Sequence, residues 1–284
     1  MRLAEQIQAI ERRGIGSVGV STTGRADRLI PTAWSGIDAA LQGGLVCGAM
    51  HEWFGIASPT AFDMRAGEKR TYKDRFWTPP VGPLVHLAWR VIESASYPQQ
   101  IVWIGDRCFP YPRVLVRGDG DDRRLLERSI FVSTHNPNDR LWAIDLSLRS
   151  PVVGLAIADG SRFDMAATRR IQLLAKVHGT LALIVRPPWE GIELSAAETR
   201  WLLRWEAPLP NVTGKEPVGY GPRWSMELLR CKGLQPDDAR RRWVLEWNRA
   251  ACLVNLSSSL ADQDRRTTAI ASSNDRPIYG QRSA

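Results

Sequence analysis

Short apolar segments alternate with helical stretches between Thr32 and Pro187. Runs of this kind, bounded by polar or breaking residues, are typical of strands that are buried on both faces. The spacing predicts strands at residues 50–54, 100–104, 129–133, 152–158 and 180–185, with helices at 83–96, 138–148 and 164–178. Strands and helices that alternate in this way predict an α/β fold, with a mostly parallel sheet covered by helices on both faces.

The following segments have a different period. Residues 200–205, 223–229 and 242–247 carry aromatic or apolar side chains two positions apart, the pattern of a strand with one covered face. We expect them to extend the same sheet in antiparallel fashion, so that the core spans residues 32–256. Residues 257–284 are rich in serine and charged side chains, which leave too little apolar surface to offset ordering entropy, and are expected to be a disordered tail.

The N-terminal residues 1–14 predict a short amphipathic helix that ends at Gly14. Leu3, Ile7 and Ile10 share one face of it, which would pack on the chain's own core or dock on another protein. Residues 15–31 are rich in glycine, serine and threonine and are expected to be a linker.

Composition limits the class of protein. The chain is 44% hydrophobic and 24% charged, has no apolar run of about eighteen residues, and begins without the pattern of a secretory signal. We therefore expect a globular cytoplasmic protein that makes no membrane contact. The formal net charge of +8 suits an anionic partner. The four cysteines and four histidines have no metal-ligand spacing, so free, mostly buried thiols and no metal site are expected.

Residues 30–55 carry the most informative motif. A threonine, a short helical stretch with Asp38, the Gly43-Gly44 turn and the run Glu52-Trp-Phe-Gly55 resemble the beginning of the core domain in the RecA recombinase family. The resemblance implies a RecA-like P-loop NTPase core. A phosphate loop should follow, with Gly-Lys-Ser/Thr at its end. Counting from Gly55 instead places Thr60, Ala61 and Phe62 there, and no other Gly-Lys-Ser/Thr occurs in the chain.

Two further positions of a RecA-like ATPase can be placed. The strand at 152–158 leads into Asp159, where P-loop enzymes hold magnesium through water; a residue that merely caps the strand end is the alternative interpretation. Arg107 occupies the position of the glutamate that orients the attacking water, although Asp106 lies beside it, and a guanidinium cannot accept a proton. Without the lysine and the metal's hydroxyl ligand, we expect no useful ATP hydrolysis and no nucleotide cofactor.

Two later blocks narrow the resemblance. Residues 166–187 and 223–247 are similar to the corresponding segments of the ImuA family, whose members also lack a working phosphate loop. The departures are the polar segment 62–80 and Asn248, where that family tends to have aspartate. The resemblance implies a non-catalytic accessory protein of SOS-induced mutagenic translesion synthesis and DNA-damage tolerance. Its partners would be ImuB, an inactive Y-family polymerase homologue, and an error-prone catalytic subunit of polymerase III. The RecA-like shape would also allow contact with RecA itself, for which helix 3–13 is the candidate dock.

Arginines interleaved with tryptophans make weak, salt-dependent contact with single-stranded DNA a further possibility. The candidates are Arg169, Arg170, Arg186, Arg223, Arg230 and Lys232. The alternative is that the tryptophans form the covered face of the C-terminal strands while the arginines coat the outside. Two rival functions remain: an ATP-dependent RecA-like ATPase or recombinase with a displaced nucleotide site, and a stand-alone module that binds single-stranded DNA.

Overall fold

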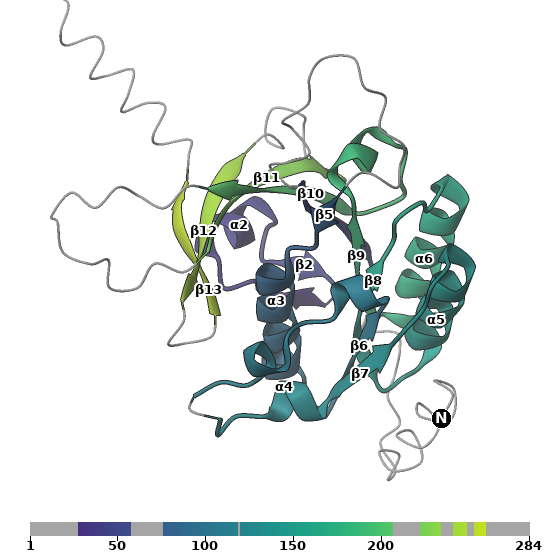
Figure 1. The fold of residues 1–284 in the computed structure, drawn as a ribbon, viewed down its shortest axis with the longest axis horizontal. Coiled ribbons are helices and arrows are strands. Elements are labelled where there is room, and N and C mark those ends of the chain that lie inside the picture. The colour runs from purple at the N-terminus through teal and green to yellow at the C-terminus, as the bar shows by residue number, and fades with distance from the viewer. Residues whose placement is uncertain are drawn as a thin grey trace, which may run out of the picture.

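A computed structural model describes residues 28–57, 76–118, 120–206, 222–233, 241–248 and 253–259. Its centre is a large twisted sheet, in the order β13-β12-β11-β10-β3-β9-β8-β6-β7 (Figure 1). The strands are β3 (Met50–Phe54), β6 (Gln100–Ile104), β7 (Ser129–Val132), β8 (Val153–Asp159), β9 (Leu181–Arg186), β10 (Thr199–Glu206), β11 (Arg223–Cys231), β12 (Arg242–Asn248) and β13 (Leu253–Ser259). The predicted α/β class and each predicted strand are confirmed.

The direction of one strand differs from the prediction. β10 runs parallel to β3, in the register Thr199 with His51, and antiparallel to β11. The parallel part of the sheet is therefore one strand wider than expected, and the antiparallel part begins at β11. Apolar side chains two positions apart in residues 200–205 indicate a strand with one covered face, but this pattern is the same for parallel and antiparallel strands.

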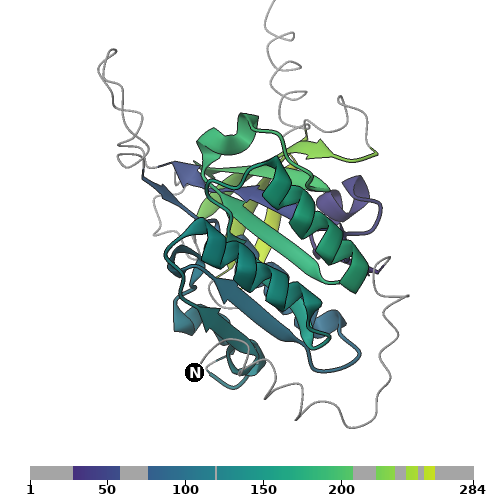
Figure 2. The same ribbon diagram turned by 90° about the vertical axis from the view of Figure 1, so that its right-hand side faces the viewer.

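Helices cover both faces of the sheet, as predicted. α3 (Val81–Ser94) packs on one face, and α5 (Pro137–Arg149) and α6 (Met165–His178) lie side by side on the other (Figures 1 and 2). Shorter elements join them: α2 (Ser35–Ala40), α4 (Arg124–Glu127), η4 (Asp106–Cys108), η5 (Pro112–Leu115) and η6 (Pro188–Ile192). α6 begins at its cap Asp164, which accepts from the amide of Ala167, and ends at Gly179 in the left-handed region. No helix among the described residues is long and apolar enough to span a membrane.

The structure changes two expected boundaries, one at each end of the core. β1 (Leu29–Ile30) pairs with β2 (Leu45–Val46), so the last residues of the expected linker are part of the fold. At the other end β13 extends to Ser259, beyond the expected start of the tail at Ser257. Pairing with β12 satisfies the backbone N–H and C=O groups of these residues, and side-chain polarity gives no information on such pairing. Residues 1–27 and 260–284 lie outside the described structure.

The core has two halves, one on each face of the sheet. Along β6, Ile101 and Trp103 face α3, whereas Val102 and Ile104 face α5 and α6, as the alternation of a strand requires. Three fully buried tryptophans continue the first half: the Trp53 and Trp201 rings stack at 5.6 Å, and Trp243 tilts against Trp201 at 6.0 Å. The interpretation that the tryptophans of the C-terminal strands form a covered face therefore holds for Trp201, Trp224 and Trp243, whereas Trp205 is 51% exposed.

Two buried histidines, which are neutral, form hydrogen bonds with polar groups of neighbouring segments. His86 stacks on Trp34, and its Nε2 lies 2.7 Å from the Thr32 carbonyl while the amide of Val254 donates to its Nδ1. His51 lies 2.7 Å from the Thr199 hydroxyl and 3.1 Å from the Val46 carbonyl. Burial lowers the pKa of each ring to about 4, against an ordinary value of 6.5.

Acidification should therefore destabilise the fold. Between about pH 6.5 and pH 4 these histidines are protonated in the unfolded chain but stay neutral in the folded protein. The free energy of unfolding therefore falls as the pH drops through this window. The expected slope is up to about 1.4 kcal/mol per pH unit for each histidine. Urea unfolding at a series of pH values measures it, and His86→Gln should reduce the slope. A free energy of unfolding that is constant across this window would contradict the assignment.

Candidate functional site

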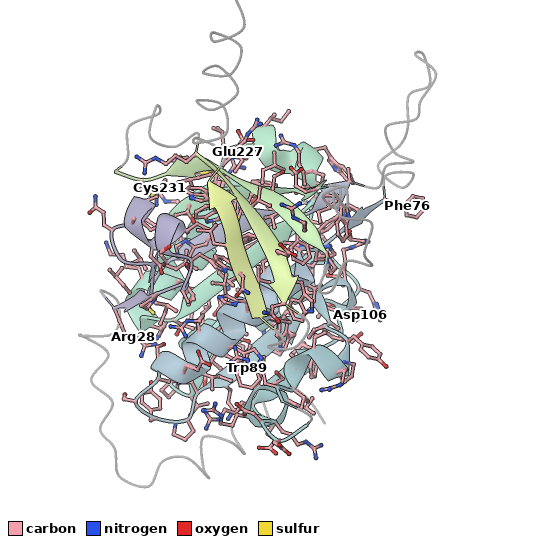
Figure 3. All side chains as sticks on the ribbon, turned by 90° about the vertical axis from the view of Figure 1, so that its left-hand side faces the viewer. Arg28, Phe76, Trp89, Asp106, Glu227 and Cys231 are labelled. Atoms are coloured by element: carbon pink, nitrogen blue, oxygen red, sulfur yellow. The ribbon has the colours of Figure 1, made fainter. Side chains whose placement is uncertain are left out.

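The carboxyl ends of the parallel strands, where open α/β sheets place their ligands, surround a pocket. Its volume is about 280 Å³. It is lined by the residues that follow β6, β7, β8 and β9, together with β5 (Trp77–Thr78): Phe76, Trp77, Arg107, His135, Pro137, Arg140, Asp159, Ser161, Arg162 and Trp189. Figure 3 shows the labelled Phe76, next to β5, and Asp106, in η4, on the same side of the molecule.

Asp159, the expected metal-binding carboxylate, is buried at the end of β8. Its Oδ1 accepts hydrogen bonds from the amide of Ser161 at 2.8 Å and from the Ser161 hydroxyl. Its Oδ2 lies 3.9 Å from Nε of Arg107. The carboxylate thus closes a tight Asx-type turn and faces a guanidinium, as in the capping interpretation of this residue.

Arg107, the residue at the expected glutamate position, lies across from Asp159. Gly105 makes this approach possible: its φ is +87°, and an added Cβ would lie 3.0 Å from Cβ of Asp159. The Arg107 guanidinium lies over the Trp77 ring, 5.0 Å from its centroid, and donates to the Trp77 carbonyl at 3.3 Å. Asp106 is exposed beside it and is not part of the pocket lining.

These side chains do not fit the magnesium ion that a P-loop nucleotide site would require. One oxygen of Asp159 is already taken by the two donors of Ser161, and the other faces a cation. The remaining charged groups in the lining are arginines, which repel a metal ion and cannot ligate it. Magnesium prefers carboxylates, phosphates and water in octahedral geometry.

The chain also leaves β3 in a way that differs from a phosphate loop. Gly55 donates to the Arg186 carbonyl at 2.8 Å, and the next residues form β4 (Ile56–Ala57), which pairs antiparallel with β5. α3 begins only at Val81, after this strand pair. The expected loop positions Thr60, Ala61 and Phe62 lie outside the described residues.

Gly55 should be intolerant of a side chain. A Cβ at this position would lie 2.4 Å from Cε3 of Trp77 and 2.5 Å from the Thr78 carbonyl oxygen. Gly55→Ala should therefore lower the free energy of unfolding by about 1–3 kcal/mol through overpacking. The matched control is Gly191→Ala, because the nearest atoms to an added Cβ there lie at 3.9 Å or beyond. Equal thermal stability of the two variants would show that β5 does not press on Gly55.

The glutamate of the motif in residues 30–55 has a structural role. Glu52 is fully buried and accepts from Nη1 of Arg186 at 2.9 Å and from Nε of Arg200 at 2.7 Å. Arg186 also donates to Glu190 at 2.9 Å and to Glu193 at 2.7 Å. Burial alone would lower the pKa of Arg186, but the carboxylates of Glu52 and Glu190 more than offset burial, so its pKa is raised.

Arg186 is therefore withdrawn as a candidate for nucleic-acid contact, because its side chain has no exposed surface. Arg223 is also buried and lies 3.9 Å from Glu246. Arg169 and Arg170 are exposed on α6, where Arg170 pairs with Asp145. The exposed pair at the end of β11 makes contacts within the chain: Arg230 donates to the Ser195 carbonyl, and Lys232 lies 3.4 Å from Glu198.

The other predicted positions have mixed outcomes. Leu3, Ile7 and Ile10 lie outside the described residues. Cys47 and Cys108 are buried, as expected, and Cys231 is half-buried; burial raises the pKa of Cys108 well above its ordinary value. Sequence reasoning missed Arg140 and His135 of the pocket. An arginine in an amphipathic helix predicts a solvated face, so no signal in the sequence marked Arg140.

Comparison with known proteins supports the RecA-like fold and the similarity to ImuA. The crystal structure of the RadB recombinase matches 80% of this chain and 99% of its own, with a TM-score of 0.52 and 11% sequence identity. Proteins named ImuA from two strains of Caulobacter vibrioides are 28% identical, over 58% of this chain and 68% of their own length. No protein-family model matches the chain. The chain is thus a distant homologue of protein ImuA with a RecA-like fold.

Proposed function

We propose that this protein is a non-catalytic accessory subunit of a mutagenic translesion synthesis complex, in which it acts by binding other proteins. The partners would be an ImuB-like inactive Y-family polymerase and an error-prone catalytic subunit of polymerase III, with RecA as a further contact. The single observation that carries the proposal is the distant homology to protein ImuA over 58% of the chain. The RecA-like fold is consistent with this role.

The charges of the pocket support the non-catalytic part of the proposal. A P-loop ATPase balances a triphosphate with a lysine and a magnesium ion, and it places a carboxylate where it can orient water. Here Arg107 faces Asp159 at 3.9 Å, and the strand pair β4–β5 follows Gly55. The positive charges come from arginines of η4 and α5 and from Arg162, which follows β8. Asp159 is the one carboxylate among the described residues of the pocket lining, and it already accepts from Ser161 and faces Arg107, which favours a non-catalytic role.

The experiment that tests the role is purification of a complex. The full chain should co-purify with the ImuB-like protein of the same genome when both are expressed together, and size-exclusion chromatography should show one joint peak. Because the proposed role needs no nucleotide, adding EDTA or omitting ATP should leave the joint peak unchanged. The matched control is an active Y-family polymerase of the same organism, which should not co-elute. Separate elution of this chain and the ImuB-like protein under all conditions would refute the proposed role.

A further inference from the structure

The pocket at the carboxyl ends of the strands has an excess of positive charge. Arg107, Arg140 and Arg162 contribute three guanidinium groups, against the single carboxylate of Asp159. Both oxygens of Asp159 already face donors, Ser161 on one side and Arg107 on the other. Glu190, which lies nearby, is occupied by Arg186 and by the backbone amide of Arg162. With His135 left out of the count, the lining carries a formal charge of +2, from three positive groups and one negative group.

Arg140 has a buried donor that is not satisfied within the described residues. It is 7% exposed, and one terminal nitrogen donates to the Ser161 carbonyl at 2.9 Å. Its Nε is buried and has no hydrogen-bond acceptor among the residues that the structure describes. A buried, charged donor without an acceptor costs more than an ordinary lost hydrogen bond, so native proteins rarely leave one unsatisfied. A ligand oxygen in the pocket would supply the acceptor.

Helix α5 adds a second source of positive potential. The helix begins at Pro137, which lines the pocket, and Arg140 extends from its first turn. The amino end of a helix of this length carries a partial positive charge that favours an anion. Its cap, Asn136, accepts from the amide of Asp139, so that one amide is already satisfied. The helix end and the buried guanidinium therefore act on the same pocket.

We propose that this pocket binds a phosphate group without a metal ion, held by the guanidinium groups of Arg107, Arg140 and Arg162. The arginines belong to different elements, and a tetrahedral phosphate offers enough oxygens to accept from all of them, whereas a carboxylate has only two. A phosphate dianion also balances the formal charge of the lining. The group would come from inorganic phosphate or from a mononucleotide, for which the Trp77 and Trp189 rings of the lining offer an apolar surface.

This inference goes beyond the proposed accessory role and does not depend on it. It assigns an anionic ligand to a pocket whose side chains do not fit the magnesium ion of a P-loop site. The proposed event is binding alone, without a chemical reaction. The pocket would serve as a sensor or a structural anion site.

The test is titration of the purified full chain with inorganic phosphate and with AMP in EDTA. Isothermal titration calorimetry measures affinity, and the phosphorus NMR line of each probe reports contact. We expect saturable binding that magnesium does not strengthen. Arg107→Gln should weaken binding about tenfold or more, since a lost charged hydrogen bond is worth at least this factor. Arg107 is about half exposed, so the variant should still fold. Arg140→Gln should also weaken binding.

The matched control is Arg170→Gln, which removes the same charge from an arginine on α6 that is paired with Asp145 and does not line the pocket. Its affinity for both probes should equal that of the parent protein. Tighter binding of AMP than of phosphate would identify a nucleotide as the source, and equal affinities would identify phosphate itself. Absence of saturable binding by either probe would overturn the proposal, as would equal weakening by Arg107→Gln and Arg170→Gln.

Discussion

Arg186→Met should lower the free energy of unfolding by about 3–5 kcal/mol, because it leaves buried carboxylates without their cation. The Arg186 side chain is fully buried and contacts Glu52, Glu190 and Glu193. Methionine fills similar space but donates no hydrogen bond, so Glu190 loses the charged donor Arg186 and Glu52 keeps Arg200. Urea unfolding followed by tryptophan fluorescence measures the loss.

The control for this prediction is Arg204→Met on strand β10, which is separated from the strand of Arg186 by β3. Arg204 is about half exposed and pairs with Glu227 at 2.9 Å, so its loss should cost less than about 1 kcal/mol. Arg186→Lys should also be destabilising, because an ammonium cannot span the separate acceptors that the guanidinium fork reaches. If Arg186→Met and Arg204→Met proved equally stable, the buried network would not have the role assigned to it.

Trp201→Ala is the other substitution with a large expected effect, about 3–5 kcal/mol of lost stability from the cavity that it leaves. Trp201 is fully buried between Trp53 and Trp243, and its indole nitrogen donates to the Thr199 hydroxyl at 2.7 Å. Thermal and urea unfolding measure the loss.

Trp205→Ala, at the other end of β10, is the matched control. Trp205 is 51% exposed and stacks on Trp224 at 5.8 Å, so its removal should cost less than half as much as that of Trp201. The comparison distinguishes a tryptophan that builds the core from one that a single-stranded nucleic acid could reach. Equal losses for the two variants would contradict the assignment of Trp201 to the core.

Much of the fold is predictable from the sequence because burial leaves a clear pattern. Residues 100–104 and 180–185 match β6 and β9, since a central strand that is buried on both faces has a nearly continuous apolar sequence. The period of two identified β11 and β12 for a similar reason. The direction of β10 and the strand β13 are not predicted, because both depend on which neighbour pairs with the backbone rather than on side-chain polarity.

The site is less predictable, because single charged residues have no period. Arg107 and Asp159 could be placed from the resemblance to RecA-like proteins, and the structure brings them to 3.9 Å. Arg186 was expected at the surface, yet it is buried and pairs with Glu52 of β3, with Glu190 of η6 and with Glu193, which follows η6. The amphipathic sequence of helix α5 predicts that Arg140 is solvated. In the structure Arg140 is instead buried and donates to the Ser161 carbonyl.

The central claim is that this RecA-like scaffold does not hydrolyse ATP, and release of phosphate from magnesium-ATP by the purified full chain tests it most directly. The account predicts no release above that of buffer, with or without single-stranded DNA. Asp159→Asn, measured in parallel, should give the same background rate. Magnesium-dependent turnover that rises with protein concentration and disappears in Asp159→Asn would contradict the account.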